Sequence, residues 1–133
     1  MNILSFLKPK HEVIFVYEDD TVEKAVELLR KQRFTSIPIL SRDNDYIGTL
    51  SEGDLLYAVY NLGKKDSSKI KICDLERHRD YEAVIVTDPI VSLITRASEE
   101  NFVPVLDTGK KFIGIVTRKK LLDYFFETKF VIL

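Results

Sequence analysis

Two stretches of the chain carry apolar residues at the spacing of an amphipathic helix, which buries one face. Positions i, i+3, i+4 and i+7 hold Val22, Ala25, Val26 and Leu29 in the first stretch and Ile90, Leu93, Ile94 and Ala97 in the second. Asp20 and Asp88 precede them as candidate N-caps, with Thr21 or Pro89 at the first helical position. Each stretch therefore predicts a helix packed on a core through one face.

Short apolar runs on both sides of each helix predict strands. The strands expected before the helices are 13–17 and 83–87. After each helix we expect two more strands, separated by a polar turn at 41–45 in the first case and 107–111 in the second. A further helix then begins near Ser51 or Thr117. The order strand, helix, strand, strand, helix thus occurs twice.

The two halves of the chain are copies of one pattern. Residues 36–40 match 102–106, and residues 46–51 match 112–117 at the same offset. A module this short cannot cover both faces of its own sheet, whereas two copies packed together can. We expect the first module in 1–60, a connector rich in Lys, Ser and Gly in 61–71, and the second module in 72–133.

Composition limits the kinds of function. With 20 Lys and Arg against 21 Asp and Glu, the formal charge of −1 argues against binding to nucleic acid or an anionic membrane. No apolar run approaches the roughly 20 residues that a membrane-spanning helix needs, so a cytoplasmic location is expected. Cys73 is the only cysteine of the sequence, and the two histidines have no zinc-site spacing. We therefore expect no disulfide and no metal site.

Each repeat contains an apolar-Pro-apolar strand, a glycine in the next strand and a hydroxyl residue before the second helix. These elements are Ile37-Pro38-Ile39, Gly48 and Ser51-Glu52-Gly53-Asp54 in the first repeat, and Val103-Pro104-Val105, Gly114 and Thr117-Arg118-Lys119-Lys120 in the second. Their order, occurring twice, resembles the CBS domain. The resemblance implies an α/β (α+β) fold of two βαββα modules packed about a pseudo-twofold axis, with helices covering small mixed sheets. It also implies a Bateman module whose clefts bind adenine-containing ligands.

The first repeat has the complete Ser-x-x-Asp motif. By resemblance, Ser51 lies near a phosphate and Asp54 near ribose hydroxyls, while Thr35, Ser36 and Ile37 surround the adenine ring. A helix N-terminus attracts phosphate, and a carboxylate accepts from two hydroxyls, so these roles are chemically sound. The alternatives are that Ser51 and Asp54 form a capping box and that the strand residues belong to the core.

The second repeat departs from the motif. Phe102 and Val103 take the adenine positions and Thr117 the phosphate position, but Lys120 replaces the acid. Arg118 and Lys120 lie in the first turn of a helix, where the macrodipole disfavours cations, so an anion bound there would account for them. The alternative is that these cations point into solvent. Basic residues before the first strand of each repeat, Lys8, Lys10, His78 and Arg79, are interpreted as solvated loop, the alternative being that they close over a bound phosphate.

The function expected from the sequence is that of a regulatory module rather than an enzyme, because the chain shows no nucleophile–base pair, P-loop or metal cluster. The ligands expected first are AMP, ADP or ATP. The second half also resembles small Gram-positive CBS proteins that bind cyclic di-AMP, which is the alternative ligand. A stand-alone sensor needs an unidentified regulated protein as partner, and apolar residues on the second helices predict a homodimer. A ligand-independent interaction adaptor is the alternative from another class.

Overall fold

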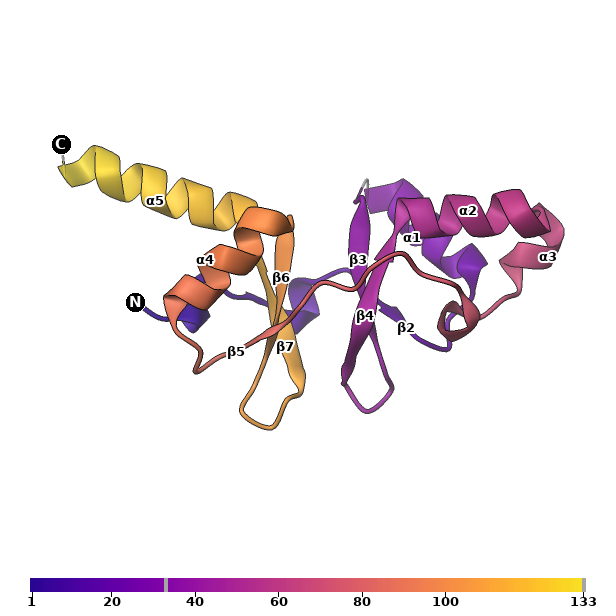
Figure 1. Ribbon diagram of the computed structural model, residues 1–133, viewed down its shortest axis with the longest axis horizontal. Coiled ribbons are helices and arrows are strands. Elements are labelled where there is room, and N and C mark those ends of the chain that lie inside the picture. Colours follow the sequence, from indigo (N-terminus) through magenta and orange to yellow (C-terminus); the bar gives the residue numbers. More distant parts are fainter. Residues whose placement is uncertain (33, 133) are drawn as a thin grey trace. The chain divides into compact units, whose positions relative to one another are not determined.

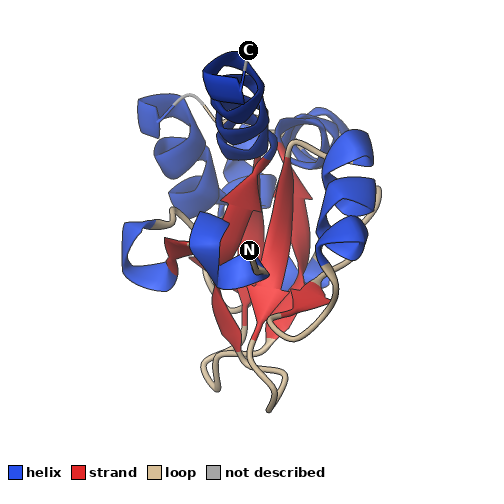
Figure 2. Ribbon diagram, turned by 90° about the vertical axis from the view of Figure 1, so that its left-hand side faces the viewer, coloured by secondary structure: helices blue, strands red, loops and turns tan. Residues whose placement is uncertain are grey.

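The computed structural model describes the backbone of residues 1–32 and 34–132. Side chains are described for residues 1–32 and 34–127. The chain forms two compact units (Figure 1). Unit 1 contains Met1–Val13 and the residues from Tyr81 onward, and unit 2 contains Ile14–Asp80. In both units the strands are short and have helices beside them (Figure 2). Each unit therefore has its own sheet and its own core.

Unit 2 is built on a sheet with the strand order β2-β3-β4. Its strands and longer helices are β2 (Val16–Tyr17), α1 (Val22–Gln32), β3 (Ser36–Leu40), β4 (Tyr46–Ser51) and α2 (Glu52–Leu62). Strand β3 runs parallel to β2 and antiparallel to β4. One face of α1 and the start of α2 pack on this sheet. The core consists of Val16, Val22, Ala25, Leu29, Ile37, Ile39, Leu50, Leu55 and Ile72.

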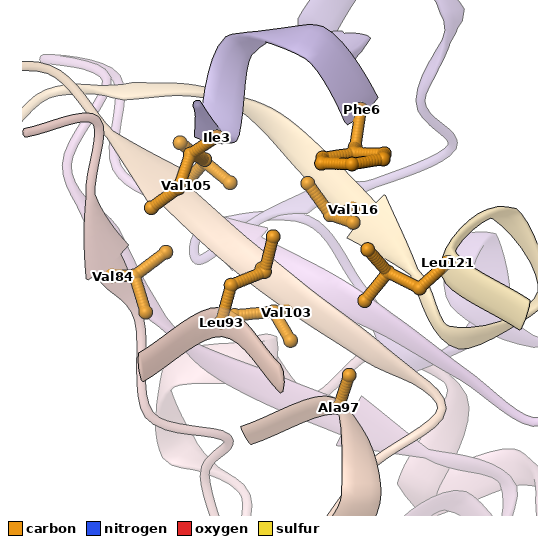
Figure 3. Packing of buried hydrophobic residues seen from close by; sticks show 9 residues of the cluster. All are labelled: Ile3, Phe6, Val84, Leu93, Ala97, Val103, Val105, Val116 and Leu121. Atoms are coloured by element: carbon orange, nitrogen blue, oxygen red, sulfur yellow. The ribbon is translucent and has the colours of Figure 1, made fainter. Parts of the chain in front are cut away.

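Unit 1 repeats this arrangement and adds one strand, giving the order β1-β7-β6-β5. Its elements are β1 (Lys8–Pro9), β5 (Val84–Ile85), α4 (Ile90–Glu99), β6 (Phe102–Leu106), β7 (Phe112–Thr117) and α5 (Arg118–Ile132), with short 3₁₀ turns at Ile3–Phe6 and Lys10–Glu12. Figure 3 shows its core, formed by Ile3, Phe6, Val84, Leu93, Ala97, Val103, Val105, Val116 and Leu121. The N-terminal residues thus complete the core of the second repeat.

The predicted order of strand, helix, strand, strand and helix is confirmed in both repeats, as is the α+β class with small mixed sheets. The first strand of each repeat is shorter than expected, because only Val16–Tyr17 and Val84–Ile85 pair with a neighbour. The apolar residues at i, i+3 and i+7 of α1 are buried, and so are those at i+3 and i+7 of α4, while Ile90 at position i of α4 is half-buried.

The predicted helix caps are wrong by one residue. Asp20 and Asp88 do not cap α1 and α4. Instead their carboxylates accept from the backbone N–H three residues upstream, at Tyr17 (2.8 Å) and Ile85 (2.9 Å). Each aspartate therefore closes the turn between strand and helix. Thr21 caps α1, because its hydroxyl accepts from the N–H of Lys24, and Pro89 is the N-cap of α4.

The compact units divide the chain differently from the ranges 1–60, 61–71 and 72–133. Residues 1–13 pack with the second repeat because β1 pairs with β7 and the 3₁₀ turn before it buries Ile3 and Phe6. Part of the expected connector is the helix α3 (Lys64–Ser68). Beyond it, Ile72 enters the core of unit 2, so the chain stays on that unit as far as Asp80.

Candidate functional site

The N-terminus of α2 holds the first-repeat motif in a complete capping box. The Ser51 hydroxyl accepts from the N–H of Asp54 at 3.1 Å, and Asp54 Oδ2 accepts from the N–H of Ser51 at 2.9 Å. These bonds satisfy backbone donors that a helix start leaves without intrahelical partners. The motif therefore has a structural role, whatever else it binds.

Asp54 also holds the segment that follows the core residue Ile72. Its second oxygen, Oδ1, accepts from the N–H of His78 at 2.8 Å. The residue is only 5% exposed. An ionised carboxylate has about four acceptor positions, so two remain after these backbone bonds. The carboxylate of Asp54 is thus fixed in place and still has acceptor capacity.

Beside this carboxylate lies a cleft of about 530 Å³, which we call the α2 cleft. It is lined by Ser51, Gly53, Asp54, Tyr57, Glu76, Arg77 and His78. One wall is the first turns of α2, and the other is the segment Glu76–His78. The cleft combines a helix N-terminus, cationic or hydrogen-bond-donating side chains, and acceptors in Ser51 and Asp54. Such a combination suits a ligand with both phosphate and hydroxyl groups.

The segment that forms the second wall is held on β4 by two side chains, which we call the Arg77–Asp80 bridge. Asp80 Oδ1 accepts from the N–H of Thr49 at 2.9 Å, and Arg77 donates to the carbonyl of Thr49 at 3.3 Å. Arg77 and Asp80 also form an ion pair with each other. The bridge passes over Gly48, where an added Cβ would overlap both side chains. A glycine is therefore needed for this close approach.

The corresponding helix start in unit 1 is only half capped. The Thr117 hydroxyl accepts from the N–H of Lys120 at 3.1 Å, but Lys120 has no carboxylate to return the bond. Arg118 Nε donates to the carbonyl of Ala97 at 2.7 Å. This carbonyl lies in the last turns of α4, the negative end of that helix. Contact with α4 is thus a second way to account for the position of Arg118, beside the expected anion.

The groove beside Arg118 has a different character from the α2 cleft. It measures about 330 Å³ and is lined by Ile94, Ala97, Ser98, Arg118, Leu121, Leu122 and Phe125. Lys119 and Lys120 are exposed and do not line it. Arg118 is the charged residue among those that line the groove, and its Nε donates a hydrogen bond to the carbonyl of Ala97. The chemistry of this groove is therefore mainly apolar.

The strand residues expected around an adenine ring lie next to the helix starts. Ser36 pairs with Ser51, and the carbonyl of Thr35 accepts from the N–H of Glu52 at 2.9 Å. Phe102 pairs with Thr117 in the same register in unit 1. Ile37 and Val103 are buried in the two cores, which satisfies the core interpretation of these positions. The strand residues do not line the α2 cleft, whereas Ser51 and Asp54 do.

Several residues of the cleft were not predicted from the sequence. Gly53, Tyr57, Glu76 and Arg77 were not expected to bind a ligand, and His78 was assigned to solvated loop. The signal available was the basic run Arg77 to Arg79 just before the first strand of the second repeat. Among the described helices, none has the length and apolarity needed to cross a bilayer.

Comparison with solved structures finds the same fold in proteins of low sequence identity. CbpB in complex with c-di-AMP matches with a TM-score of 0.85 and 19% identity, covering 96% of this chain and 85% of that one. CBSX2 of Arabidopsis thaliana in complex with AMP matches with a TM-score of 0.76 and 22% identity, covering 96% and 98%. At these identities the matches establish the fold alone.

Sequence comparison finds similarity to parts of longer proteins. A homoserine O-acetyltransferase of Methanococcus vannielii is 23% identical over 110 residues, which is 81% of this chain. The chain spans 22% of the length of that relative and 28% of a second curated relative from Methanocaldococcus jannaschii. The CBS domain family matches residues 5–61 and 78–127, which is most of the sequence. The chain therefore belongs to the CBS domain family and carries two repeats of the domain.

Proposed function

We propose that the chain is a regulatory module that binds an adenine nucleotide in the α2 cleft and signals its occupancy to a partner protein in the cytoplasm. The observation that carries the proposal is the meeting of a helix N-terminus, a cationic segment and a fixed carboxylate in one cleft of about 530 Å³. Ligand pockets commonly measure about 300–1,000 Å³. CBS-domain proteins are generally regulatory rather than catalytic, which supports a binding function.

Each part of a nucleotide has a suitable group in or beside the cleft. Phosphate oxygens suit the start of α2, with Arg77 and His78 on the opposite wall. The remaining acceptor positions of Asp54 suit ribose hydroxyls. By family resemblance, the base would lie near Thr35, Ser36 and Ile37. The second repeat would contribute Phe102, Val103, Thr117, Arg118 and Lys120 to its own, unequal cleft.

The proposed ligands are AMP, ADP or ATP, with cyclic di-AMP as the alternative. A fixed carboxylate favours a ribonucleotide whose 2′ and 3′ hydroxyls are both available, because each can donate to Asp54. Cyclic di-AMP has its 3′ oxygens esterified, so each of its riboses offers one hydroxyl donor instead of two. The structural similarity to CbpB bound to c-di-AMP and to CBSX2 bound to AMP supports an adenine nucleotide as the ligand. It does not favour one of these nucleotides over the others.

Calorimetry with AMP, ADP, ATP and cyclic di-AMP tests the proposal directly. We expect one of them to bind and to raise the melting temperature. Asp54→Asn should weaken AMP more than 2′,3′-dideoxy-AMP, because only AMP has the hydroxyl donors. Glu52→Gln is the matched control, since Glu52 is an exposed acid in the same turn that does not line the cleft. If AMP and its dideoxy analogue lose affinity equally, the ribose assignment is wrong.

Exposed apolar side chains on α2 and α5 support a homodimer, in which a second copy covers them. They include Leu56 (70% exposed), Tyr60 (82%), Leu122 (63%) and Phe126 (69%). Several large apolar side chains exposed on one helix often mark an interaction site. The same surface supports the second candidate function, a ligand-independent adaptor. Light scattering at micromolar concentration should give a dimer mass that falls to monomer in Leu56→Glu with Leu122→Glu, and a wild-type monomer would refute the dimer.

A further inference from the structure

One wall of the α2 cleft is held by side chains rather than by a core. The start of α2 is anchored by the capping box and by Leu55, which is 5% exposed. The opposite wall, Glu76–His78, follows the last apolar anchors of the segment, Ile72 and Leu75. Beyond these anchors, the Arg77–Asp80 bridge connects the segment to β4, and the N–H of His78 connects it to Asp54 at the start of α2. The shape of the cleft therefore depends on the bridge.

Asp80 is the part of this bridge that does not line the cleft. It accepts from the N–H of Thr49 on β4 and pairs with Arg77, which does line the cleft. Removing its charge would weaken both the pair with the Arg77 guanidinium and the bond from the N–H of Thr49 on β4. Asp80 can thus alter the cleft from outside, through the position of Arg77 and His78.

We propose that Asp80 is a positioning residue for the α2 cleft, and that nucleotide binding and docking of the segment Glu76–Asp80 on β4 stabilise each other. This inference rests on the proposed function of the cleft. A ligand that touches both walls binds better when the segment is docked, and by thermodynamic reciprocity it favours the docked segment to the same extent. Binding is thereby coupled to the place where the chain leaves unit 2 for unit 1, between Asp80 and Tyr81.

Two variants weaken docking by different routes. Asp80→Asn removes the charge but keeps the size of the side chain. Gly48→Ala keeps both charges and displaces them, because its Cβ would occupy the space of the Asp80 carboxylate and the Arg77 guanidinium. The backbone of Gly48 does not have a positive φ, so alanine is conformationally acceptable there. The control is Glu82→Gln, which removes an acid that pairs with Arg96 within unit 1.

The experiment measures affinity and amide hydrogen exchange on the wild type and these three variants. The probe is whichever of AMP, ADP, ATP and cyclic di-AMP binds the wild type most tightly by calorimetry. We expect Asp80→Asn and Gly48→Ala each to lose affinity by about fivefold or more, within the usual range of coupling between sites, and Glu82→Gln to match the wild type. In the wild type, nucleotide should slow exchange in peptides covering residues 75–80, and in both bridge variants this protection should shrink.

The outcomes separate this inference from the function on which it rests. If a nucleotide binds but both bridge variants keep wild-type affinity, the coupling is refuted while the nucleotide-binding function stands. A fall in melting temperature without a change in affinity would make the bridge a structural clamp alone, and would also refute it. The coupling is also refuted if saturating nucleotide does not change amide hydrogen exchange in residues 75–80. If none of the four nucleotides binds, both the function and the coupling are wrong.

Discussion

The two repeats protect the same strand edge in different ways. In unit 1 the edge of β7 is paired with the backbone of β1, where Lys8 and Pro9 lie opposite Ile115 and Gly114. In unit 2 the equivalent edge of β4 is met by the side chains of Arg77 and Asp80. A sheet edge exposes N–H and C=O groups that must find partners, and both solutions supply them. The difference is that a Cβ added at Gly114 would meet the backbone of Lys8, whereas one added at Gly48 would meet side-chain ends that can move away.

The second helices differ in a parallel way. α2 begins with a reciprocal capping box, and its acid also holds the N–H of His78. α5 begins with a hydroxyl cap alone, and its first cation reaches across to α4. In the first repeat the motif therefore fixes the carboxylate of Asp54 beside a cleft. In the second repeat, Arg118 of the same motif connects α5 to α4. Polar contacts for a ligand are concentrated in unit 2.

The largest expected effect on stability comes from the glycines at the two strand edges, Gly114 in β7 and Gly48 in β4. Gly114→Ala should destabilise the protein by about 2–4 kcal/mol, because its φ of +157° disfavours an L side chain and its Cβ would overlap the backbone carbonyl of Lys8. Gly48→Ala should cost about 1 kcal/mol or less, since only side-chain ends must move. Urea denaturation of both variants measures the difference. Equal losses would mean that the two edges are equally rigid.

The next effect concerns the position at which the motifs differ. Asp54→Ala should destabilise the protein by about 2–3 kcal/mol, because the N–H groups of Ser51 and His78 lose a charged acceptor. Lys120→Ala, the matched change in unit 1, should leave the free energy of unfolding nearly unchanged because Thr117 still caps the helix. Chemical denaturation at neutral pH checks both. A small loss for Asp54→Ala would contradict the double role of its carboxylate.

A smaller effect is expected where α5 contacts α4. Arg118→Ala should lower stability by about 1 kcal/mol, because the carbonyl of Ala97 loses its bond to Nε. Lys119→Ala is the control, since Lys119 is exposed in the same turn. Thermal melts of the two variants without nucleotide provide the comparison. If Arg118→Ala raised the melting temperature instead, the cation would be held there against the helix dipole and an anion site would again be favoured.

The smallest effect tests whether the second repeat can be given the cap of the first. Lys120→Asp places an acid three residues after Thr117, as Asp54 follows Ser51. It should stabilise the protein by about 0.5–1 kcal/mol through a reciprocal bond and a favourable interaction with the helix dipole. The change is measured as an increase in the urea midpoint. A loss of stability would show that the start of α5 cannot adopt the capping-box geometry.

The parts of the fold that were predictable are those encoded by local patterns. Helical periodicity identifies the buried faces of α1 and α4, and the spacing of Ser51 and Asp54 predicts the capping box. The Arg77–Asp80 bridge was not predictable, because it joins an irregular segment to Gly48 and Thr49, about thirty residues away. β1 is two residues long and includes a proline, so it carries no strand pattern of its own.

For the site, the sequence indicated one wall and missed the other. Ser51 and Asp54 belong to a motif that the sequence shows. The other wall, Glu76–His78, lies opposite them in the fold, where the N–H of His78 donates to Asp54. At the start of α5 the structure shows a contact that the sequence did not indicate. Arg118 suggested an anion site because its helix position is electrostatically unfavourable, but the negative end of α4 lies within reach. Local charge patterns do not reveal such partners from another element.

The pairing of β1 with β7 has a consequence for how the chain folds during synthesis. Unit 2 is continuous, so residues 14–80 can fold as soon as they have left the ribosome. Unit 1 cannot form then, because its N-terminal turn and strand must await residues 112–117, more than a hundred positions later. The apolar side chains of Ile3 and Phe6 are therefore without their native core until the residues between Val84 and Leu121 have been synthesised. Residues 1–13 thus reach their native contacts later than residues 14–80, although they precede them in the chain.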